Sequence, residues 1–220
     1  MTPLLNTQSL DSDEALSKGQ IRQANETLIL TAAERVFAGA GFSGATMAAI
    51  ADASGLPKAN LHYYFGSKQA LYRTVLARTL EDWLLPAQAI TPEADPKTAI
   101  EAYIRAKMTL SAQRPHASKV FANELLHGAP IVKNLLATEL RGMVVSKAAV
   151  LQGWIDQGRM APVDPTHLFF TLWAATQTYA DFDEQVCAVL GRPQLTAQDH
   201  AQATEHVVSL LLRGCGLSGQ

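Results

Sequence analysis

Apolar residues recur at three- and four-residue intervals along most of the chain. Between Arg22 and Ala40 the spacing is carried by Ile29, Ala32, Ala33, Val36, Phe37 and Ala40. This stripe is typical of an amphipathic helix, because 3.6 residues per turn bring such positions to one face. The sequence contains no convincing run of alternating β-branched residues, which would indicate a strand. The pattern therefore predicts an all-α protein.

Glycine, proline and short polar residues divide this pattern into segments. Thr46 can cap a short second helix that Gly55 ends, and Pro57 suits the first turn of a third. Ser67 can cap a long fourth helix that ends at the breaker TPEADP, residues 91–96. The remaining segments, each bounded by Gly or Pro, predict helices over 97–113, 115–128, 131–157, 165–190 and 196–213.

Composition and charge narrow the class of protein. The chain has 220 residues, of which 48% are hydrophobic and 17% charged, so it can bury a core and is not a disordered protein. Its formal net charge of −2 gives no general attraction to nucleic acid. Any affinity for DNA must therefore come from a local patch.

The sequence also argues against a membrane span, a signal peptide, a disulfide and a metal site. No run approaches the ~18 apolar residues of a membrane span, and the first residues lack the features of a signal peptide. We therefore expect a cytoplasmic protein without a membrane partner, in which residues 1–20 form a flexible tail. Cys187 and Cys215 lie far apart and are expected to be free thiols. The histidines share no helix face, so we expect neither a metal site nor a cofactor.

A small residue, a turn glycine and an apolar anchor follow one another in the N-terminal part. These are Ala51, Gly55 and Leu61, at the spacing of a helix-turn-helix motif. The small side chain lets two helices cross closely, and the glycine turns the chain between them. Because glycine ends many helices, this triplet alone is weak evidence for DNA binding.

The charges of the same stretch strengthen the DNA-binding interpretation. Lys58 and Lys68 each fall in the first turn of a predicted helix, where the helix dipole disfavours a cation by ~0.3–1 kcal/mol. A phosphate would reverse that cost. Arg73 follows, and no acidic residue lies between Lys58 and Arg73. The alternative is that the lysines are ordinary solvated residues and that Tyr64 or Phe65 belongs to the core.

The stretch FAGAGFSGATMAAIADASGLPKANLHYYFGSKQALY resembles the DNA-binding domain of TetR-type repressors, over about residues 21–75. The resemblance implies that the third helix enters the major groove of double-stranded operator DNA. It also implies that Thr46, Tyr63 and Lys68 hold phosphates. Because Lys58 and Asn60 begin the third helix, we expect them to face bases. The candidate DNA-binding residues are Thr46, Lys58, Ala59, Asn60, His62, Tyr63 and Lys68. One departure is Pro57, which stands where the family usually has a serine or threonine cap.

A dinucleotide-binding fingerprint competes for part of this stretch. GAGFSG, residues 39–44, satisfies G-x-G-x-x-G. That fingerprint should follow a buried strand and precede a crossover helix, whereas the preceding TLILTAAERVFA has helical spacing. The dinucleotide interpretation is therefore a minor alternative.

The rest of the chain resembles a ligand-binding domain. WAATQTYADF, GWIDQGRMAPVDPTHL and IEAYIRAKMTLSAQRPHASKVFANELL are similar to the ligand domain of TetR-family regulators of pyrimidine utilisation. This resemblance implies a small-molecule effector, with uracil or thymine as candidates. Together the two resemblances predict a helix-turn-helix domain over 21–70 and a helical ligand-binding and dimerisation domain over 71–215.

A flat nucleobase needs an aromatic or apolar face and a group that both donates and accepts hydrogen bonds. Trp173 and Gln177 are four residues apart and share a helix face. The full set of candidate ligand-binding residues is Trp173, Gln177, Tyr179, Asn123, Glu124 and Met108. For each there is a structural alternative, because a buried glutamine commonly satisfies backbone groups and a helical tryptophan commonly fills a core.

The last two predicted helices, 165–190 and 196–213, are apolar around more of their surface than one core face requires. Pairing with the same helices of a second copy would give a four-helix interface, whereas a wide core stripe in a monomer is the alternative.

The leading hypothesis is a homodimeric, ligand-responsive transcriptional repressor. An all-helical enzyme using Glu124, Asp181 or a histidine is the rival, but no catalytic signature supports it. A helical adaptor would leave the Lys58–Arg73 patch unexplained.

Overall fold

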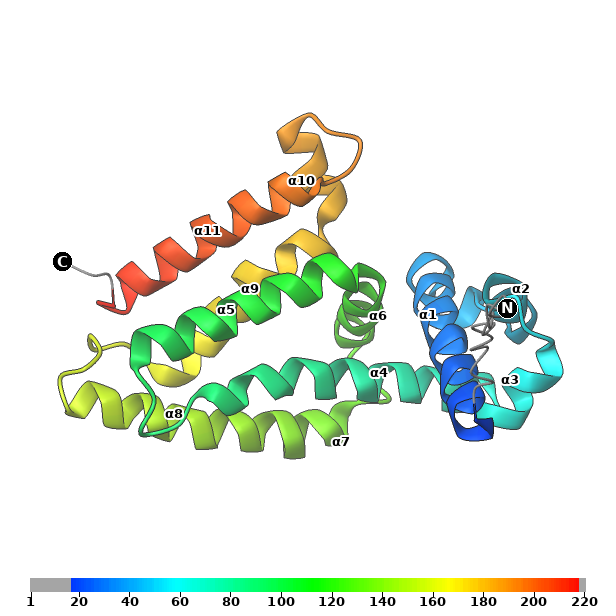
Figure 1. The fold of residues 1–220 in the computed structure, drawn as a ribbon, viewed down its shortest axis with the longest axis horizontal. Helices are drawn as coiled ribbons and strands as arrows, with labels where there is room; N and C mark the ends of the chain where they lie inside the picture. Colours follow the sequence, from blue (N-terminus) through cyan, green and yellow to red (C-terminus); the bar gives the residue numbers. More distant parts are fainter. Residues whose placement is uncertain (1–16, 218–220) are drawn as a thin grey trace, which may run out of the picture.

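The computed structural model describes residues 17–217, and within that range every regular element is a helix. The first three helices, α1, α2 and α3, lie together at one end of the molecule, and α4 leads from them into a larger helical part (Figure 1). Their bounds are α1 Lys18–Gly44, α2 Met47–Ser54, α3 Lys58–Phe65 and α4 Lys68–Leu84. The expected all-α fold is confirmed, with a helix-turn-helix unit preceding a helical domain.

Three of the predicted helix boundaries are confirmed by their hydrogen bonds and backbone angles. The hydroxyl of Thr46 accepts from the backbone N–H of Ala49 at 3.1 Å, which caps α2. Gly55 ends α2 in the left-handed conformation, with φ 69°. The hydroxyl of Ser67 caps α4 by accepting from the N–H of Ala70 at 3.1 Å.

The start of α1 lies earlier than the sequence predicts. Ser17 caps this helix through reciprocal hydrogen bonds with Gln20, so residues 18–20 of the expected tail are helical. Residues 1–16 of that tail lie outside the described range. The capping box explains the difference, because it satisfies N–H groups that a frayed end would leave to water.

The end of α1 also differs from the prediction. The helix passes Ala40 and reaches Gly44 through a kink at Gly41, which has φ 67°. The GAGFSG run therefore completes a helix and does not follow a strand, which removes the context that dinucleotide binding requires. Pro57 precedes α3 as its N-cap with φ −55° and ψ 141°, so the helix begins at Lys58 and has no side-chain cap.

The larger part contains seven further α-helices and two short irregular ones among the described residues. Their bounds are η1 Leu85–Ala89, α5 Pro96–Gln113, α6 Pro115–Leu126, α7 Lys133–Leu135, η2 Leu136–Leu140, α8 Arg141–Asp156, α9 Pro165–Asp181, α10 Asp183–Leu190 and α11 Ala197–Gly214. Two predicted helices are divided. The segment 131–157 contains a π turn at η2, and the segment 165–190 breaks at Phe182, where φ is −123° and ψ is 36°.

Two buried clusters hold the molecule together. One includes Phe37 of α1, Leu61 of α3 and Leu76 of α4, and it continues into Val120 and Phe121 of α6. The second joins α5, α8, α9 and α11, with Tyr103, Trp154, Phe169, Leu172 and Val207 among its members. Because α6 shares a core with α1 and α4, the N-terminal helices are packed directly against the larger part.

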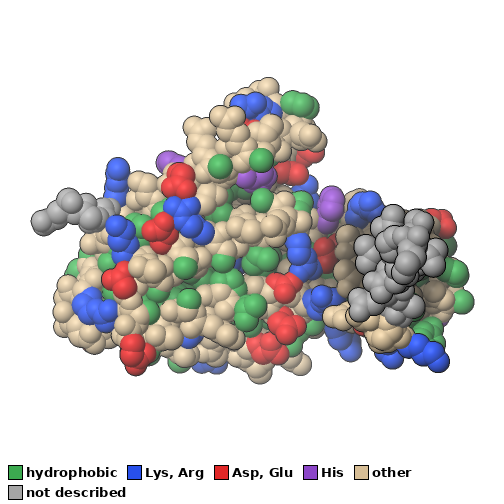
Figure 2. Space-filling model, in the orientation of Figure 1, with side chains coloured by type: hydrophobic (Ala, Val, Ile, Leu, Met, Phe, Trp, Pro, Cys, Tyr) green, Lys and Arg blue, Asp and Glu red, His purple; other side chains and the backbone are tan. Residues whose placement is uncertain are grey.

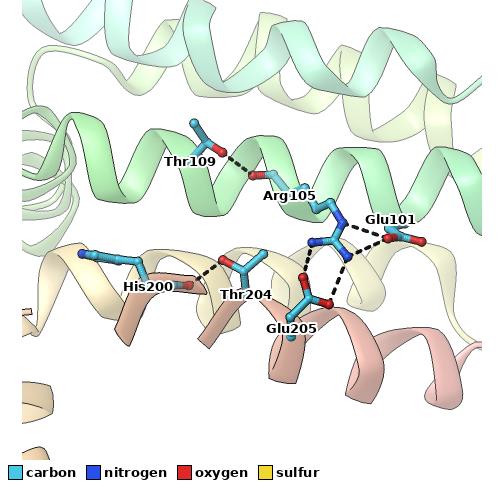
Figure 3. A network of polar contacts seen from close by, with 6 residues as sticks. All are labelled: Glu101, Arg105, Thr109, His200, Thr204 and Glu205. Carbon is cyan, nitrogen blue, oxygen red and sulfur yellow. Dashed lines mark hydrogen bonds and ion pairs between the residues drawn. The ribbon is translucent and has the colours of Figure 1, made fainter. Parts of the chain in front are cut away.

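Helix α11 is tied to α5 by an ion-pair network. The guanidinium of Arg105 donates to both carboxylate oxygens of Glu205 at 2.6 and 3.1 Å and to Glu101 at 2.8 Å (Figure 3). The bidentate geometry orients α11 on α5. Figure 2 shows acidic and basic side chains interspersed over one face of the molecule, as the near-neutral net charge leads us to expect. No helix within 17–217 is long and apolar enough to cross a membrane.

Candidate DNA-binding surface and effector cavity

Helices α2 and α3 meet as the helix-turn-helix spacing predicts. Ala51 and Leu61 are both buried, with 5% and 0% exposure, and Gly55 turns the chain between them. Burial of this small residue and this apolar anchor fixes α3 against α2. The opposite side of α3 is left facing solvent.

Most of the candidate DNA-binding residues lie on that solvent side. Lys58, Ala59 and His62 are exposed, and Tyr63 exposes 76% of its surface, whereas Asn60 is half-buried. Thr46 is also exposed, although its hydroxyl accepts the capping bond of α2. The exposed side chains of Tyr63, Lys58 and His62 on α3 offer hydrogen-bond donors to a phosphate backbone. Contact with DNA remains a prediction for each of these residues.

Lys68 has a role in the free protein that the sequence did not indicate. Its ammonium donates to the carbonyls of Phe42 at 2.7 Å and Ala45 at 2.9 Å, and lies 4.5 Å from the ring centre of Phe42. These contacts close the turn between α1 and α2. An ammonium has three N–H donors, so one donor remains for the phosphate contact predicted from the family.

The start of α1 adds basic residues to the same surface. Lys18 and Arg22 line a shallow hollow together with Tyr63 and Tyr64. The hydroxyl of Tyr64 accepts from Asn25 at 3.2 Å, which anchors this half-buried tyrosine to α1. The sequence analysis missed Lys18 and Arg22, because no local motif connects the start of α1 with the end of α3.

A partly open cavity of about 160 Å³ lies between α4, α5, α6, η2, α8 and α9; it is the candidate site for a small-molecule effector, and we call it the effector cavity. Its lining is mostly apolar, with three polar side chains that converge on it: Trp173, Gln177 and Lys107. The apolar part consists of Leu80, Trp83, Leu84, Phe121, Leu125, Leu136, Leu140 and Met143. The π turn of η2 supplies Leu136 and Leu140, in keeping with the frequent use of such turns at functional sites.

Trp173 and Gln177 come together as the sequence predicts, one helical turn apart on α9. The indole N–H of Trp173 donates to the hydroxyl of Tyr103 at 2.8 Å. This bond holds the indole in place, while burial raises the pKa of Tyr103 to about 12 and keeps it neutral. The cavity therefore has a fixed aromatic wall next to a carboxamide.

Lys107 is a residue of the effector cavity that the sequence analysis missed. It is 2% exposed on α5, and its ammonium nitrogen lies 4.2 Å from the ring centre of Trp83. A signal was available, since Lys107 stands three residues after Ile104 and four after Tyr103, which are both buried. A lysine on the apolar face of a predicted helix is a candidate site residue, because buried lysines are rare.

The other predicted ligand-binding residues lie elsewhere. Asn123 is exposed on α6, and Met108 is buried in the second core cluster. The carboxylate of Glu124 accepts from the hydroxyl of Tyr72 and from the N–H groups of residues 131 and 132, so it holds a loop. Tyr179 lines two other hollows, near α10 and α11. Helical periodicity predicted the position of each residue along its helix, but it did not predict whether the side chain points into the cavity.

A larger hollow of about 660 Å³ lies between α9, α10 and α11. Phe182, Val186, Val189, Leu190 and Leu195 are among its lining residues. Several large apolar side chains are exposed in these helices, among them Phe170, Phe182, Val189 and Leu210. Such an exposed apolar surface is typical of a contact with another protein surface, whereas the smaller effector cavity suits a small ligand.

Neither part of the described chain contains a metal centre: residues 17–217 hold no group of three or more His, Cys, Asp or Glu side chains that could bind an ion. Cys187 and Cys215 are both free and buried, as the sequence predicts.

Two family descriptions match consecutive parts of the chain. "Bacterial regulatory proteins, tetR family" matches residues 29–75, and "YcdC-like protein, C-terminal region" matches residues 76–218. The two matches meet within α4. The HTH-type transcriptional regulator RutR of Escherichia coli strain K12 is 41% identical over 191 residues, which cover 87% of this chain and 90% of that protein.

Solved structures agree on the fold. The ketosteroid transcriptional regulator KstR2 of Mycobacterium tuberculosis superposes with a TM-score of 0.68 at 18% identity, covering 90% of this chain and 96% of that one. A tetR-family regulatory protein from Rhodococcus RHA1 gives a TM-score of 0.69 at 18% identity, covering 93% and 100%. At such identity these two structures show a shared fold alone.

Proposed function

The chain belongs to the TetR family of transcriptional regulators, and we propose that its effector is a free pyrimidine base, uracil or thymine, held in the effector cavity. Regulators of this family bind operator DNA as dimers and respond to small molecules. The observation that carries the proposal is the convergence of Trp173, Gln177 and Lys107 on one small cavity. It is supported by 41% identity to RutR, the regulator of pyrimidine utilisation.

The size of the effector cavity favours a single ring. Drug-sized ligands occupy pockets of ~300–1,000 Å³, whereas a cavity of ~150 Å³ in another protein accepts benzene. The cavity of about 160 Å³ thus suits a six-membered ring. A purine has a second fused ring and would need the apolar lining to move.

The polar groups suit the edge of a pyrimidine base. Uracil and thymine present alternating C=O and N–H groups around the ring, and the carboxamide of Gln177 can donate to one and accept from its neighbour. The rings of Trp173 and Trp83 can cover the faces of the base, since both line the cavity. Tyr103 keeps the indole N–H of Trp173 occupied, so this residue offers its ring and not its donor.

Effector binding can reach the DNA-binding helices through elements that line the effector cavity. Leu80, Trp83 and Leu84 lie on α4, and Phe121 and Leu125 lie on α6. Both helices belong to the buried cluster that contains Phe37 and Leu61. A ligand that prefers one arrangement of α4 and α6 would change the spacing of the two α3 helices in a dimer and so change operator affinity.

For DNA, we propose that a dimer reads a pseudo-palindromic duplex whose half-site centres lie ~34–36 Å apart or a multiple of that spacing. In this arrangement Lys58, Ala59, Asn60 and His62 face the major groove. Thr46, Tyr63 and Lys68 contact phosphates.

We also propose a division into two domains, a DNA-binding domain over about 21–70 and a ligand and dimerisation domain over about 71–215. The boundary falls within α4. The proposed place of action is the cytoplasm, where operator DNA lies.

Calorimetric titration tests the proposed effector. We expect heat with uracil or thymine and weaker or no binding of cytosine and adenine. Gln177→Leu removes the paired hydrogen bonds and should weaken binding by ~1–3 kcal/mol. Gln152→Leu makes the same change at an exposed position of α8, outside the cavity lining, and should bind as the unmodified protein does. Equal binding of all four bases, or no heat with either favoured base, would contradict the pyrimidine assignment.

A further inference from the structure

Lys107 reaches into the effector cavity without a polar partner in the protein. Within residues 17–217 its side chain forms no hydrogen bond or ion pair, and its nitrogen is not completely sealed from the space of the cavity. The cavity lining around it is apolar or aromatic apart from Gln177, and its ammonium lies 4.2 Å from the ring centre of Trp83. An ammonium group has three N–H donors, so either water in the empty cavity or a bound ligand can supply an acceptor.

The charge of Lys107 depends on what surrounds it. Burial in the apolar lining disfavours the ammonium form and lowers the pKa of Lys107 to about 7, while the negative field of Asp181 on α9 opposes this change. Near neutral pH the amine therefore exists in both forms while the cavity is empty. Burial also raises the pKa of Asp181, which accepts a hydrogen bond from Ser118 at 2.5 Å.

Some other charged groups on the surrounding helices are held by their own partners, and others, such as Arg78 and Glu81 of α4 and Arg141 of α8, are exposed and lie outside the cavity lining. On α4, Asp82 is paired with Arg114, and on α6, Lys119 pairs with Asp183 at 2.7 Å. Glu124 of α6 binds the loop at residues 131 and 132. On α5 itself, Glu101 and Arg105 face Glu205 of α11 (Figure 3). Asp181 is thus the carboxylate whose field acts on Lys107.

We propose that Lys107 reads a carbonyl oxygen of the effector by becoming fully protonated as the effector binds, so that binding takes up as much as one proton from solvent, depending on pH. This inference rests on the proposed pyrimidine effector. The amine nitrogen gains H⁺ from water or buffer, and the resulting ammonium donates N–H to the C=O group of the base. The nitrogen, which has no hydrogen-bond partner among residues 17–217, then has one in the ligand.

The sign of the pH dependence follows from this step. A carbonyl acceptor stabilises the ammonium form, so the pKa of Lys107 in the complex lies above its value of about 7 in the empty cavity. Affinity is then highest below pH 7 and falls as the pH rises toward the pKa of the complex. If the neutral amine accepted an N–H of the base instead, affinity would rise with pH and binding would release a proton.

Calorimetry at pH 8, in two buffers with different ionisation enthalpies, measures the number of protons taken up per uracil bound. Because burial leaves the amine largely neutral at pH 8 in the empty cavity, uptake should lie between ~0.5 and 1 proton, and affinity should fall by ~2- to 10-fold between pH 7 and pH 8. Uracil that binds with zero uptake, or with release, overturns the inference and leaves the pyrimidine assignment intact. No heat with uracil or thymine overturns both.

Variants of α5 identify the titrating group. Lys107→Met keeps most of the side-chain length and should abolish both proton uptake and the fall in affinity. Lys107→Arg keeps a donor that is always charged, so it should bind without proton uptake. Lys97→Met makes a matched change at an exposed position of the same helix and should retain the uptake of the unmodified protein. Unchanged uptake in Lys107→Met would show that another group takes the proton and would overturn the inference.

Discussion

Lys68 joins two possible roles in one side chain. Its ammonium closes the α1–α2 turn through the carbonyls of Phe42 and Ala45, and one N–H remains for a phosphate. Lys68→Ala should therefore destabilise the fold by ~1–2 kcal/mol and weaken binding to all DNA sequences alike. The slope of log affinity against log salt should become shallower by about one. Lys97→Ala is the control, because it removes a charge far from α3 and should keep the slope of the unmodified protein. An unchanged slope in Lys68→Ala would contradict the phosphate contact and leave Lys68 with its structural role alone.

Glu124 is a structural residue at the end of α6. Its buried carboxylate accepts from the hydroxyl of Tyr72 at 3.2 Å and from the N–H groups of Ile131 at 2.5 Å and Val132 at 3.3 Å. Glu124→Ala would leave these donors unpaired, so the free energy of unfolding should fall by ~2–4 kcal/mol. Glu124→Gln keeps one oxygen acceptor and should cost less. Urea unfolding measures both, and a loss below ~0.5 kcal/mol in the alanine variant would show that water replaces the carboxylate.

Among the candidate site residues, those fixed by spacing on a single helix were predictable. Trp173 and Gln177 line one cavity because residues four apart on α9 share a face. Asn123 and Met108 were placed by the same reasoning at suitable heights, but they turn to solvent and to the second core. The packing of the whole domain decides which faces of two helices meet. The pattern of a single helix does not carry this information.

At the scale of elements, helix ends with local causes were predictable and tertiary breaks were not. Thr46, Gly55 and Ser67 cap or stop helices through bonds to residues within four positions, so the sequence identifies them. The break at Phe182 has neither glycine nor proline, and the π turn at Leu136–Leu140 follows an uninterrupted apolar pattern. Both features accompany the packing of neighbouring helices, which overrides local propensity.

The junction of α5 and α6 connects the two parts of the protein through Arg114. This side chain pairs with Glu34 of α1, which is 7% exposed, and with Asp82 of α4. A connection between the DNA-binding helices and the helices of the effector cavity should carry part of the coupling between the two sites. Arg114→Met should therefore reduce the coupling free energy by ~0.5–2 kcal/mol.

Operator affinity with and without uracil, in the variant and the unmodified protein, measures that coupling. Arg105→Met is a suitable control, because it breaks the ion pairs that join α5 to α11 and leaves the contacts with α1 and α4 in place (Figure 3). Equal loss of coupling in both variants would point to general loosening of the helical domain. Full coupling in Arg114→Met would show that the signal travels through the shared apolar core.

At the scale of the whole molecule, the sharing of one core by the N-terminal helices and α6 limits how the parts can move. Val120 and Phe121 pack with residues of α1 and α4, while Phe121 also lines the effector cavity. Close-packed interiors shift between discrete arrangements more readily than they deform. A bound base would accordingly change the position of the whole N-terminal unit relative to α9 and α11.

The α9–α11 surface is where a second copy should bind. Leu210 of α11 is 58% exposed, whereas the adjacent Leu211 is 8% exposed and belongs to the core of its own protomer. Leu210→Asp would bury a carboxylate without a partner in the interface, so it should shift the protein from dimer to monomer. Leu211→Asp would instead disturb folding and would not test the interface.

Sedimentation and operator titration together check this prediction. A monomer loses the gain from binding two half-sites at once, so operator affinity should fall by at least ~100-fold. Val145→Asp introduces the same charge at a position of α8 that is 63% exposed and outside the proposed interface, so it should remain a dimer. A Leu210→Asp variant that sediments as a dimer and keeps its operator affinity would contradict the prediction. The dimer would then form through a surface other than the one that α11 shares with the exposed apolar side chains of α9 and α10, such as Phe170 and Val189.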